Sequence, residues 1–143
     1  MCIRDSDGIV LPLPEGYLDA TALVTDVPSS GPTRLVAYLR NPAQHGITVQ
    51  TWAADAPTLA GFLDFYVTAI DADTVSSVAN RRPVTMGGGE GAELTLRNRA
   101  DGQLTSVFVT MRAPGTVVMV LAPAPDEARR QAVEQVATGL RFA

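Results

Sequence analysis

The sequence predicts an α+β fold, in which an antiparallel β-sheet is combined with one helix in the middle of the chain and one at the C-terminus. Three observations support this prediction. Apolar and polar residues alternate through residues 93–112, an unbroken apolar segment follows at 117–121, and two segments carry apolar residues at helical spacing. Hydrophobic residues form 46% of the 143 positions and charged residues 18%, as is typical of a single globular domain.

The first third of the chain predicts four strands. They are separated by loops rich in proline, glycine and serine, "VPSSGPT" and "NPAQHG", which are typical turn compositions. The expected strands are residues 9–13, 17–25, 34–40 and 47–52.

The first helix is predicted within residues 55–73. Its apolar residues fall at i, i+3, i+4, i+7 and i+11 and therefore form one stripe: Leu59, Phe62, Leu63, Tyr66 and Ile70. Asp55 is the expected N-cap. Pro57 lies in the first turn, where its missing N–H removes no helical hydrogen bond.

The second half predicts four more strands and the second helix. After a strand at residues 84–86, strands ending near Arg97 and at 104–112 are separated by Asp101-Gly102, and Pro114-Gly115 leads into the apolar strand 117–121. Such short connections predict an antiparallel meander over residues 91–122. A helix capped by Asp126 follows, with Val133, Val136, Ala137 and Leu140 on one face.

The unbroken apolar strand also predicts how the helices are placed. If each helix covers a different face of the sheet, the central strand must be apolar on both sides, as residues 117–121 are. Val118 and Val120 are therefore expected among the most buried residues. The alternating strand before them should lie nearer an edge, with Arg97 and Arg99 in solvent.

The first six residues carry a different signal. Codons for Met-Cys-Ile-Arg-Asp-Ser resemble the end sequence of transposase adapters used in DNA library preparation. We interpret residues 1–6 as a sequencing-adapter artefact and residues 7–143 as a single domain, and we expect residues 1–6 to make no ordered contact with the core. Cys2 is the only cysteine, so neither a disulfide nor a thiolate metal site is expected.

Composition excludes several classes of protein. The net charge is −4, and a general nucleic-acid binder would show a basic face instead. The longest apolar run, residues 117–122, is too short to cross a bilayer. All 11 basic residues are arginine, which indicates a GC-rich bacterial genome.

Motifs for cofactors and catalysis are weak. Gly87, Gly89 and Ala92 satisfy a loose dinucleotide fingerprint, but a strand rather than a helix is expected after them, so a β-turn or bulge is the preferred interpretation. His45 is the only histidine and lies in a turn, where we expect it to be exposed. Asp71 and Asp73 lack the further ligands of a calcium loop. We therefore predict no catalytic residue, no cofactor and no metal site.

Arg81 and Arg82 are the candidate residues for binding a ligand or partner. Two adjacent guanidinium groups can grip an anion or an acidic surface. However, neighbouring residues of a strand face opposite sides of the sheet, so a joint clamp requires a bend at this point.

The whole pattern resembles the PsbP-like superfamily, which includes DcrB-like proteins and LpqN/LpqT-type actinobacterial lipoproteins. The segment "LPLPEGY" resembles the Leu-Pro-x-Gly-aromatic opening of that family, although Tyr17 stands where the family prefers tryptophan. The later landmarks are a mid-chain helix, "VTMGGGEGAEL", a long hairpin, "GTVVMVLA" and the terminal "ATGLRF", so that the resemblance spans residues 9–142. It implies an α-β-α sandwich and an accessory role without a shared catalytic motif.

The function expected from these observations is a non-enzymatic accessory or binding domain. The expected partner is a protein or a small apolar ligand, with no nucleic acid and with membrane attachment only through an N-terminal anchor that this sequence lacks. The resemblance implies an extracytoplasmic location. Two alternatives stay open, a cytoplasmic adaptor or secretion-chaperone-like protein, and a small enzyme whose acid–base chemistry would depend on carboxylates, tyrosine and arginine.

Overall fold

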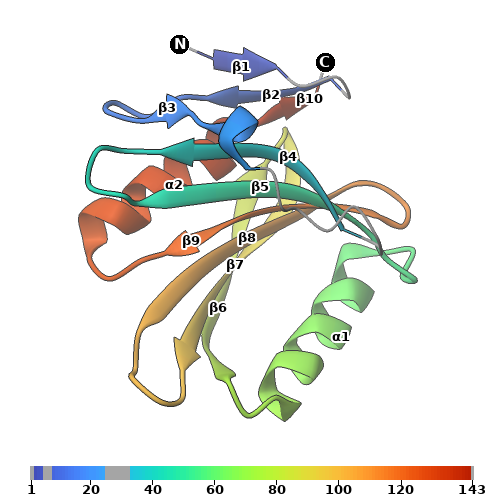
Figure 1. The fold of residues 1–143 in the computed structure, drawn as a ribbon. Coiled ribbons are helices and arrows are strands. Elements are labelled where there is room, and N and C mark those ends of the chain that lie inside the picture. The colour runs from blue at the N-terminus through green and yellow to red at the C-terminus, as the bar shows by residue number, and fades with distance from the viewer. Residues whose placement is uncertain (1, 5–7, 25–32, 143) are drawn as a thin grey trace.

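The computed structural model describes residues 2–4, 8–24 and 33–142 (Figure 1). It contains two α-helices, one short 3-10 helix and two antiparallel sheets within these residues. In chain order the elements are β1 (Cys2–Arg4), β2 (Ile9–Pro12), β3 (Leu18–Asp19), the 3-10 helix Thr21–Leu23, β4 (Thr33–Arg40), β5 (Gly46–Ala53), α1 (Leu59–Ala72), β6 (Ser76–Met86), β7 (Gly89–Asn98), β8 (Leu104–Ala113), β9 (Thr116–Pro123), α2 (Glu127–Gly139) and β10 (Arg141–Phe142). The predicted α+β class, with a mid-chain and a C-terminal helix, is confirmed.

The larger sheet has seven strands in the order β3-β4-β5-β9-β8-β7-β6. After β5 the chain passes through α1 to the far edge of the sheet at β6. It then returns strand by strand until β9 pairs with β5. All of these pairs are antiparallel, which confirms the predicted meander.

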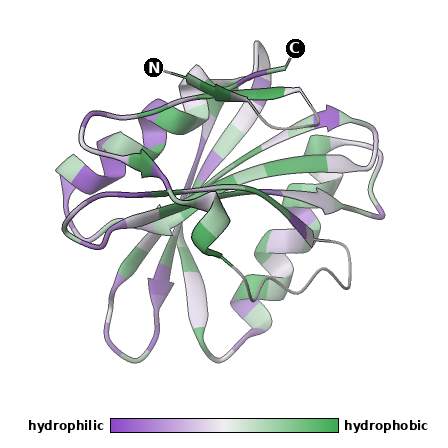
Figure 2. Ribbon diagram, turned by 45° about the horizontal axis from the view of Figure 1, so that its top comes forward, coloured by the Kyte–Doolittle hydropathy of each residue, from purple (hydrophilic) through white to green (hydrophobic). Residues whose placement is uncertain are grey.

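The two helices cover opposite faces of this sheet (Figure 1). Phe62 and Leu63 of α1 belong to one cluster of buried residues, with Val117 and Met119 of β9. The three buried residues of α2, Val133, Val136 and Ala137, belong to the other cluster, together with Leu140 just after the helix and with Val118 and Val120. Because β9 lies between the two layers, its residues Val117–Val120 are each at most 1% exposed. Figure 2 shows hydrophobic residues in the strands between the helices and mixed hydropathy along each helix.

The predicted N-cap is correct for one helix and wrong for the other. Asp126 caps α2 as predicted, since its carboxylate accepts a hydrogen bond from the Arg129 N–H at 2.9 Å. The prediction of Asp55 as the cap of α1 is wrong, because Thr58 is the N-cap and its hydroxyl accepts from the Gly61 N–H at 3.1 Å. Thr58 also follows Pro57 directly, so the helix begins after the proline instead of including it.

The smaller sheet, β1-β2-β10, lies beside α2 and adds Ile9 and Leu11 to the core of that face. Our expectation that residues 1–6 make no ordered contact is wrong. Cys2–Arg4 pair with β2, and Ile3 is partly buried against the same core. The open edge of β2 explains the contact, because its free backbone groups can pair with any nearby segment whatever its origin. Met1, Asp5 and Ser6 lie outside the described residues.

Other strand boundaries differ from the prediction in two places. The strand expected at 17–25 is reduced to Leu18–Asp19 followed by a 3-10 turn, and Thr25 lies outside the described residues. The short strand expected at 84–86 is part of β6, which runs from Ser76 to Met86 at the sheet edge. Arg97 and Arg99 are exposed, as predicted for a strand near that edge.

Candidate functional site

The two arginines predicted to bind a ligand or partner lie on the edge strand β6 with their head groups directed to opposite faces. The Arg81 guanidinium lies 3.6 Å from the Asp64 carboxylate of α1. The Arg82 guanidinium contacts Glu93 of β7 and Glu134 of α2 instead. Both residues border a shallow hollow of about 360 Å³ beside Pro83, but the strand does not bring them together as a clamp. Their binding role stays a prediction.

Arg82 belongs to an ion cluster that joins α2 to the sheet. The Glu93 side chain is 3% exposed and accepts hydrogen bonds from Arg82 at 2.5 Å and from Arg130 at 2.8 and 2.9 Å. Glu134 accepts from the same two arginines, and Glu127 accepts from Arg130 at 3.0 Å. Each guanidinium therefore bridges the sheet and the helix, and this geometry indicates a structural role.

The arginines and carboxylates of this cluster stabilise the charged forms of one another. Burial would raise the pKa of the Glu93 carboxyl, but hydrogen bonds from Arg130 and Arg82 outweigh burial and hold that pKa below its ordinary value. The hydrogen bond to Glu93 likewise raises the pKa of Arg130. Both groups stay charged near neutral pH, so neither is poised to exchange a proton there.

The expectation that His45 is exposed is wrong, because it is only 6% exposed. Its Nδ1 lies 2.6 Å from the Tyr17 hydroxyl and its Nε2 lies 2.6 Å from the Pro123 carbonyl oxygen. A carbonyl only accepts, so Nε2 donates to Pro123, and Nδ1 is hydrogen-bonded to the Tyr17 hydroxyl. The turn was predicted correctly, but the side chain points inward. Both ring nitrogens are therefore engaged by hydrogen bonds within the protein.

The glycine-rich segment is a hairpin turn. Gly87 and Gly88 link β6 to β7 and have φ angles of +60° and +80°, as the two central residues of a type I′ turn require. Because β7 follows directly, no helix begins here to hold a pyrophosphate, and the β-turn interpretation is confirmed.

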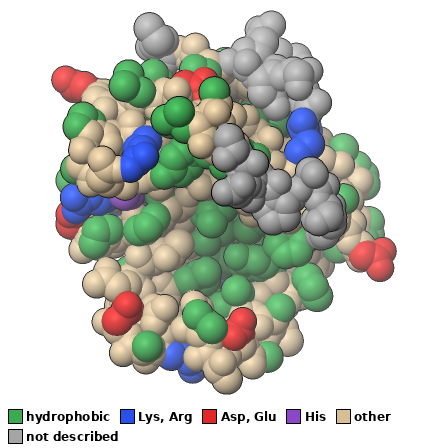
Figure 3. All heavy atoms as spheres, in the orientation of Figure 1, with side chains coloured by type: hydrophobic (Ala, Val, Ile, Leu, Met, Phe, Trp, Pro, Cys, Tyr) green, Lys and Arg blue, Asp and Glu red, His purple; other side chains and the backbone are tan. Residues whose placement is uncertain are grey.

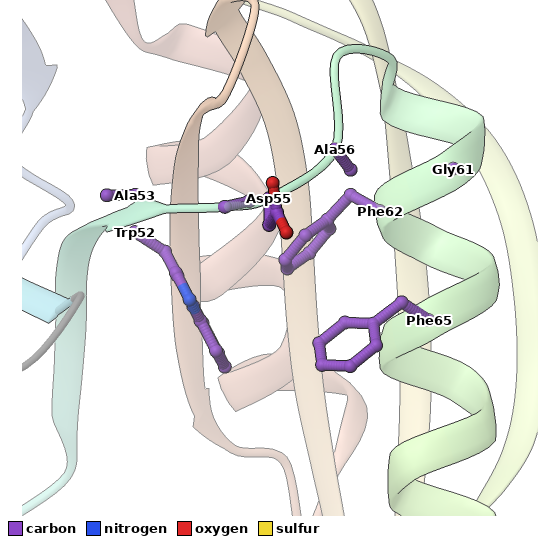
Figure 4. Close-up of a pocket in the computed structure, with 8 residues that line it drawn as sticks. Trp52, Ala53, Asp55, Ala56, Gly61, Phe62 and Phe65 are labelled. Atoms are coloured by element: carbon purple, nitrogen blue, oxygen red, sulfur yellow. The ribbon is translucent and has the colours of Figure 1, made fainter.

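An apolar pocket of about 460 Å³, which the sequence did not predict, lies between the end of β5 and the start of α1. Figure 4 shows the ring of Trp52 from β5 facing the rings of Phe62 and Phe65 from α1, with Asp55 on the connecting segment. Small residues complete the lining: Ala53, Ala54, Ala56 and Gly61. The pocket is thus a slot lined by the rings of Trp52, Phe62 and Phe65, called the aromatic wall below, and by these small side chains.

The aromatic wall is held by ring contacts. Trp52 meets Phe62 edge to face at 5.6 Å and Tyr66 at 6.0 Å, while Phe62 and Tyr66 stack at 5.7 Å. Burial raises the pKa of the Tyr66 hydroxyl, so this group stays protonated. Such contacts fix the position of the Trp52 ring and thereby preserve the width of the slot.

Phe65 differs from its neighbours, since it is 60% exposed although its ring lies 6.5 Å from that of Phe62. It does not belong to the apolar stripe of the helix, so the helical period places it outside the core. The sequence therefore contained one signal for this pocket, because Phe65 is an aromatic residue at a position where the helical period predicts a polar one. Figure 3 shows hydrophobic side chains gathered in the hollow between α1 and the central strands.

The described residues contain neither a group of metal ligands nor a membrane-spanning helix. Among residues 2–4, 8–24 and 33–142, no three histidine, cysteine, aspartate or glutamate side chains are grouped so that they could hold a metal ion. Neither helix in the described part of the chain is long and apolar enough to cross a membrane.

Comparison with known proteins finds a similar fold but no similar sequence. No family model matches the chain, and no curated protein matches it. The chain is similar in structure to LpqN of Mycobacterium tuberculosis, a protein involved in cell envelope biogenesis. The two share 16% sequence identity with a TM-score of 0.59, over 100% of this chain and 90% of LpqN. This similarity establishes the α+β fold, in agreement with the sequence prediction.

Proposed function

We propose that this chain is a non-enzymatic, extracytoplasmic accessory domain of the PsbP-like superfamily, and that it binds a small apolar ligand in the pocket between β5 and α1. The pocket is the observation that carries the proposal. Its volume of about 460 Å³ falls within the ~300–1,000 Å³ range of small-molecule sites. Its lining is apolar apart from Asp55 and the backbone.

The exposure of Phe65 supports a binding role. Full burial of a phenylalanine side chain is worth roughly 1.5–3 kcal/mol, and a ligand in the slot would recover part of the share that the 60% exposed Phe65 forgoes. The rings of Trp52 and Phe62 are already held in place by their contacts, so a ligand would need little rearrangement of this wall.

The absence of an enzymatic role is supported by the state of the titratable groups. The His45 ring has both nitrogens bonded, and the Glu93 carboxylate is neutralised by two arginines. The pocket itself contains one carboxylate, from Asp55, and no second acid or base among its lining residues.

The extracytoplasmic location is proposed from the similarity in fold to LpqN, a protein involved in cell envelope biogenesis. Its test is the gene sequence upstream of the codon for Asp7 in the source genome. A signal peptide there would support export. A start codon at that point, with no upstream signal, would contradict it and favour the cytoplasmic adaptor or secretion-chaperone-like alternative.

Binding is tested with the neutral apolar dye N-phenyl-1-naphthylamine. Trp52 is the only tryptophan of the chain, so its emission reports directly on the pocket. We expect saturable quenching of Trp52 emission together with a rise in dye emission. Phe65→Ser should weaken binding at least fivefold.

The matched control for this experiment is Leu18→Ser. Leu18 is 70% exposed, similar to Phe65, but lies on β3 outside the pocket lining. Its substitution should leave dye affinity unchanged. Equal weakening by both substitutions, or no saturable binding by the unsubstituted chain, would contradict the assignment of the ligand to this pocket.

A further inference from the structure

We infer that the pocket selects an apolar ligand with a positively charged head group over one with a negatively charged head group. This inference rests on the proposed function and specifies the chemical class of its ligand, a cationic amphiphile. The carboxylate of Asp55 is the structural basis, because it is the only ionisable side chain that lines the pocket.

Asp55 is available to a ligand. It is exposed, and no hydrogen bond or ion pair of its side chain occurs among the described residues. It follows Trp52 by three residues, on the segment that leads from β5 to α1 (Figure 4). A head group at this end of the slot would therefore meet a full negative charge at the pocket wall.

The N-terminus of α1 acts against the negative charge of Asp55. A helix N-terminus carries roughly half a positive charge, which favours anions. Two of its first amides are already bonded, since the Gly61 N–H donates to the Thr58 hydroxyl and the Phe62 N–H donates to the Thr58 carbonyl. The full charge of Asp55 exceeds the remaining partial charge, so the pocket end is negative on balance.

Two other features act in the same direction. The faces of Trp52 and Phe65 attract cations through their ring quadrupoles. The chain as a whole has a net charge of −4. A cationic head is thus favoured by the rings and by the charges around them, whereas a carboxylate head is disfavoured by both.

The test compares dodecyltrimethylammonium with dodecanoate, which have similar aliphatic chains and opposite charges. Both are titrated below their aggregation concentrations into the full chain at pH 7.5 and low ionic strength, with Trp52 emission as the readout. We expect the cation to bind about five- to tenfold more tightly. Because the effect is electrostatic and partly exposed, 0.5 M NaCl should reduce this ratio.

Asp55→Asn keeps the side-chain volume and should bring the ratio close to one. The matched control, Glu15→Gln, removes the same charge from an exposed residue outside the pocket lining and should leave the ratio unchanged. Equal affinities in the unsubstituted chain, tighter binding of dodecanoate, or a ratio unaffected by Asp55→Asn would each overturn the inference. If neither amphiphile binds but the neutral dye does, the selectivity is wrong and the proposed function stands. If the dye also fails to bind, the proposed function fails.

Discussion

The two faces of the seven-stranded sheet are completed in different ways. On one face, α2 is joined to the strands by the ion cluster around Glu93, and the sheet β1-β2-β10 covers more of the same core. On the other face, α1 is the covering element. Among the described residues, α1 and β6 are joined by the ion pair between Arg81 and Asp64 at 3.6 Å. An apolar pocket remains beside its first turns.

This difference predicts that substitutions on the two faces will affect either stability or the proposed ligand binding. On the face that α2 covers, the buried Glu93 carboxylate accepts hydrogen bonds from Arg82 and Arg130. These bonds fix the position of the helix on the sheet. The α1 face depends on aromatic packing, and one of its rings, Phe65, stays mostly in solvent. Substitutions on the face that α2 covers should therefore change the free energy of unfolding. Substitutions of exposed pocket residues such as Phe65 should change ligand affinity.

The largest expected effect separates two phenylalanines of α1. Phe62 is fully buried, and Phe62→Ala should lower the free energy of unfolding by about 3–5 kcal/mol. Phe65→Ala, three residues later on the same helix, should lower it by less than about 0.5 kcal/mol because this ring is mostly exposed. Urea unfolding measures both. A loss below ~1 kcal/mol for Phe62→Ala would place this residue outside the core.

On the face that α2 covers, Glu93→Gln should lower the free energy of unfolding by about 2–4 kcal/mol at pH 7. The substitution leaves Arg82 and Arg130 without the carboxylate that pairs them, and breaking a buried pair by removing one partner is strongly destabilising. Glu90→Gln, on the same strand but exposed, is the control and should be nearly neutral. If both substitutions had equal small effects, the cluster would not hold α2 in place.

A smaller effect should appear as the pH falls. The folded-state pKa of Glu93 lies below its ordinary value of 4.5, so between the two values the unfolded chain binds more protons. The stabilisation from Glu93 is therefore complete above about pH 4.5 and is lost as the pH falls through the folded-state pKa. Urea unfolding from pH 7 to pH 3 should show a shallower decline for Glu93→Gln than for the unsubstituted chain. Parallel curves would contradict this assignment.

The smallest expected effect concerns the β6–β7 turn. Gly87→Ala and Gly88→Ala both place an L residue at positive φ, which costs roughly 1–2 kcal/mol. A Cβ at Gly87 would lie 2.5 Å from the Phe142 ring, whereas one at Gly88 meets open space. Gly87→Ala should therefore have the lower thermal midpoint. The reverse order would show that Phe142 does not pack against this turn.

Much of the fold could be predicted because local patterns and long-range packing agree there. The apolar run of β9 requires cover on both sides, and the stripe ending at Ile70 requires a surface to pack on. The Asp126 cap and the glycines of the β6–β7 turn are local backbone requirements, so they too were readable. The candidate site was not, because Trp52 and Phe65 belong to different elements whose approach no local pattern encodes.

The sequence by itself determined the fold class, the meander, both helices and the turn at Gly87 and Gly88, because each depends on periodicity or on backbone angles of neighbouring residues. Only the tertiary structure decided the direction of side chains in irregular segments and the meeting of distant ones. His45 lies in a turn as its neighbours predict, but the Tyr17 hydroxyl and the Pro123 carbonyl bury it. Ile3 pairs because the edge of β2 is open to it. The pocket lies where the end of β5 meets the start of α1, and that meeting depends on where the helix packs on the sheet.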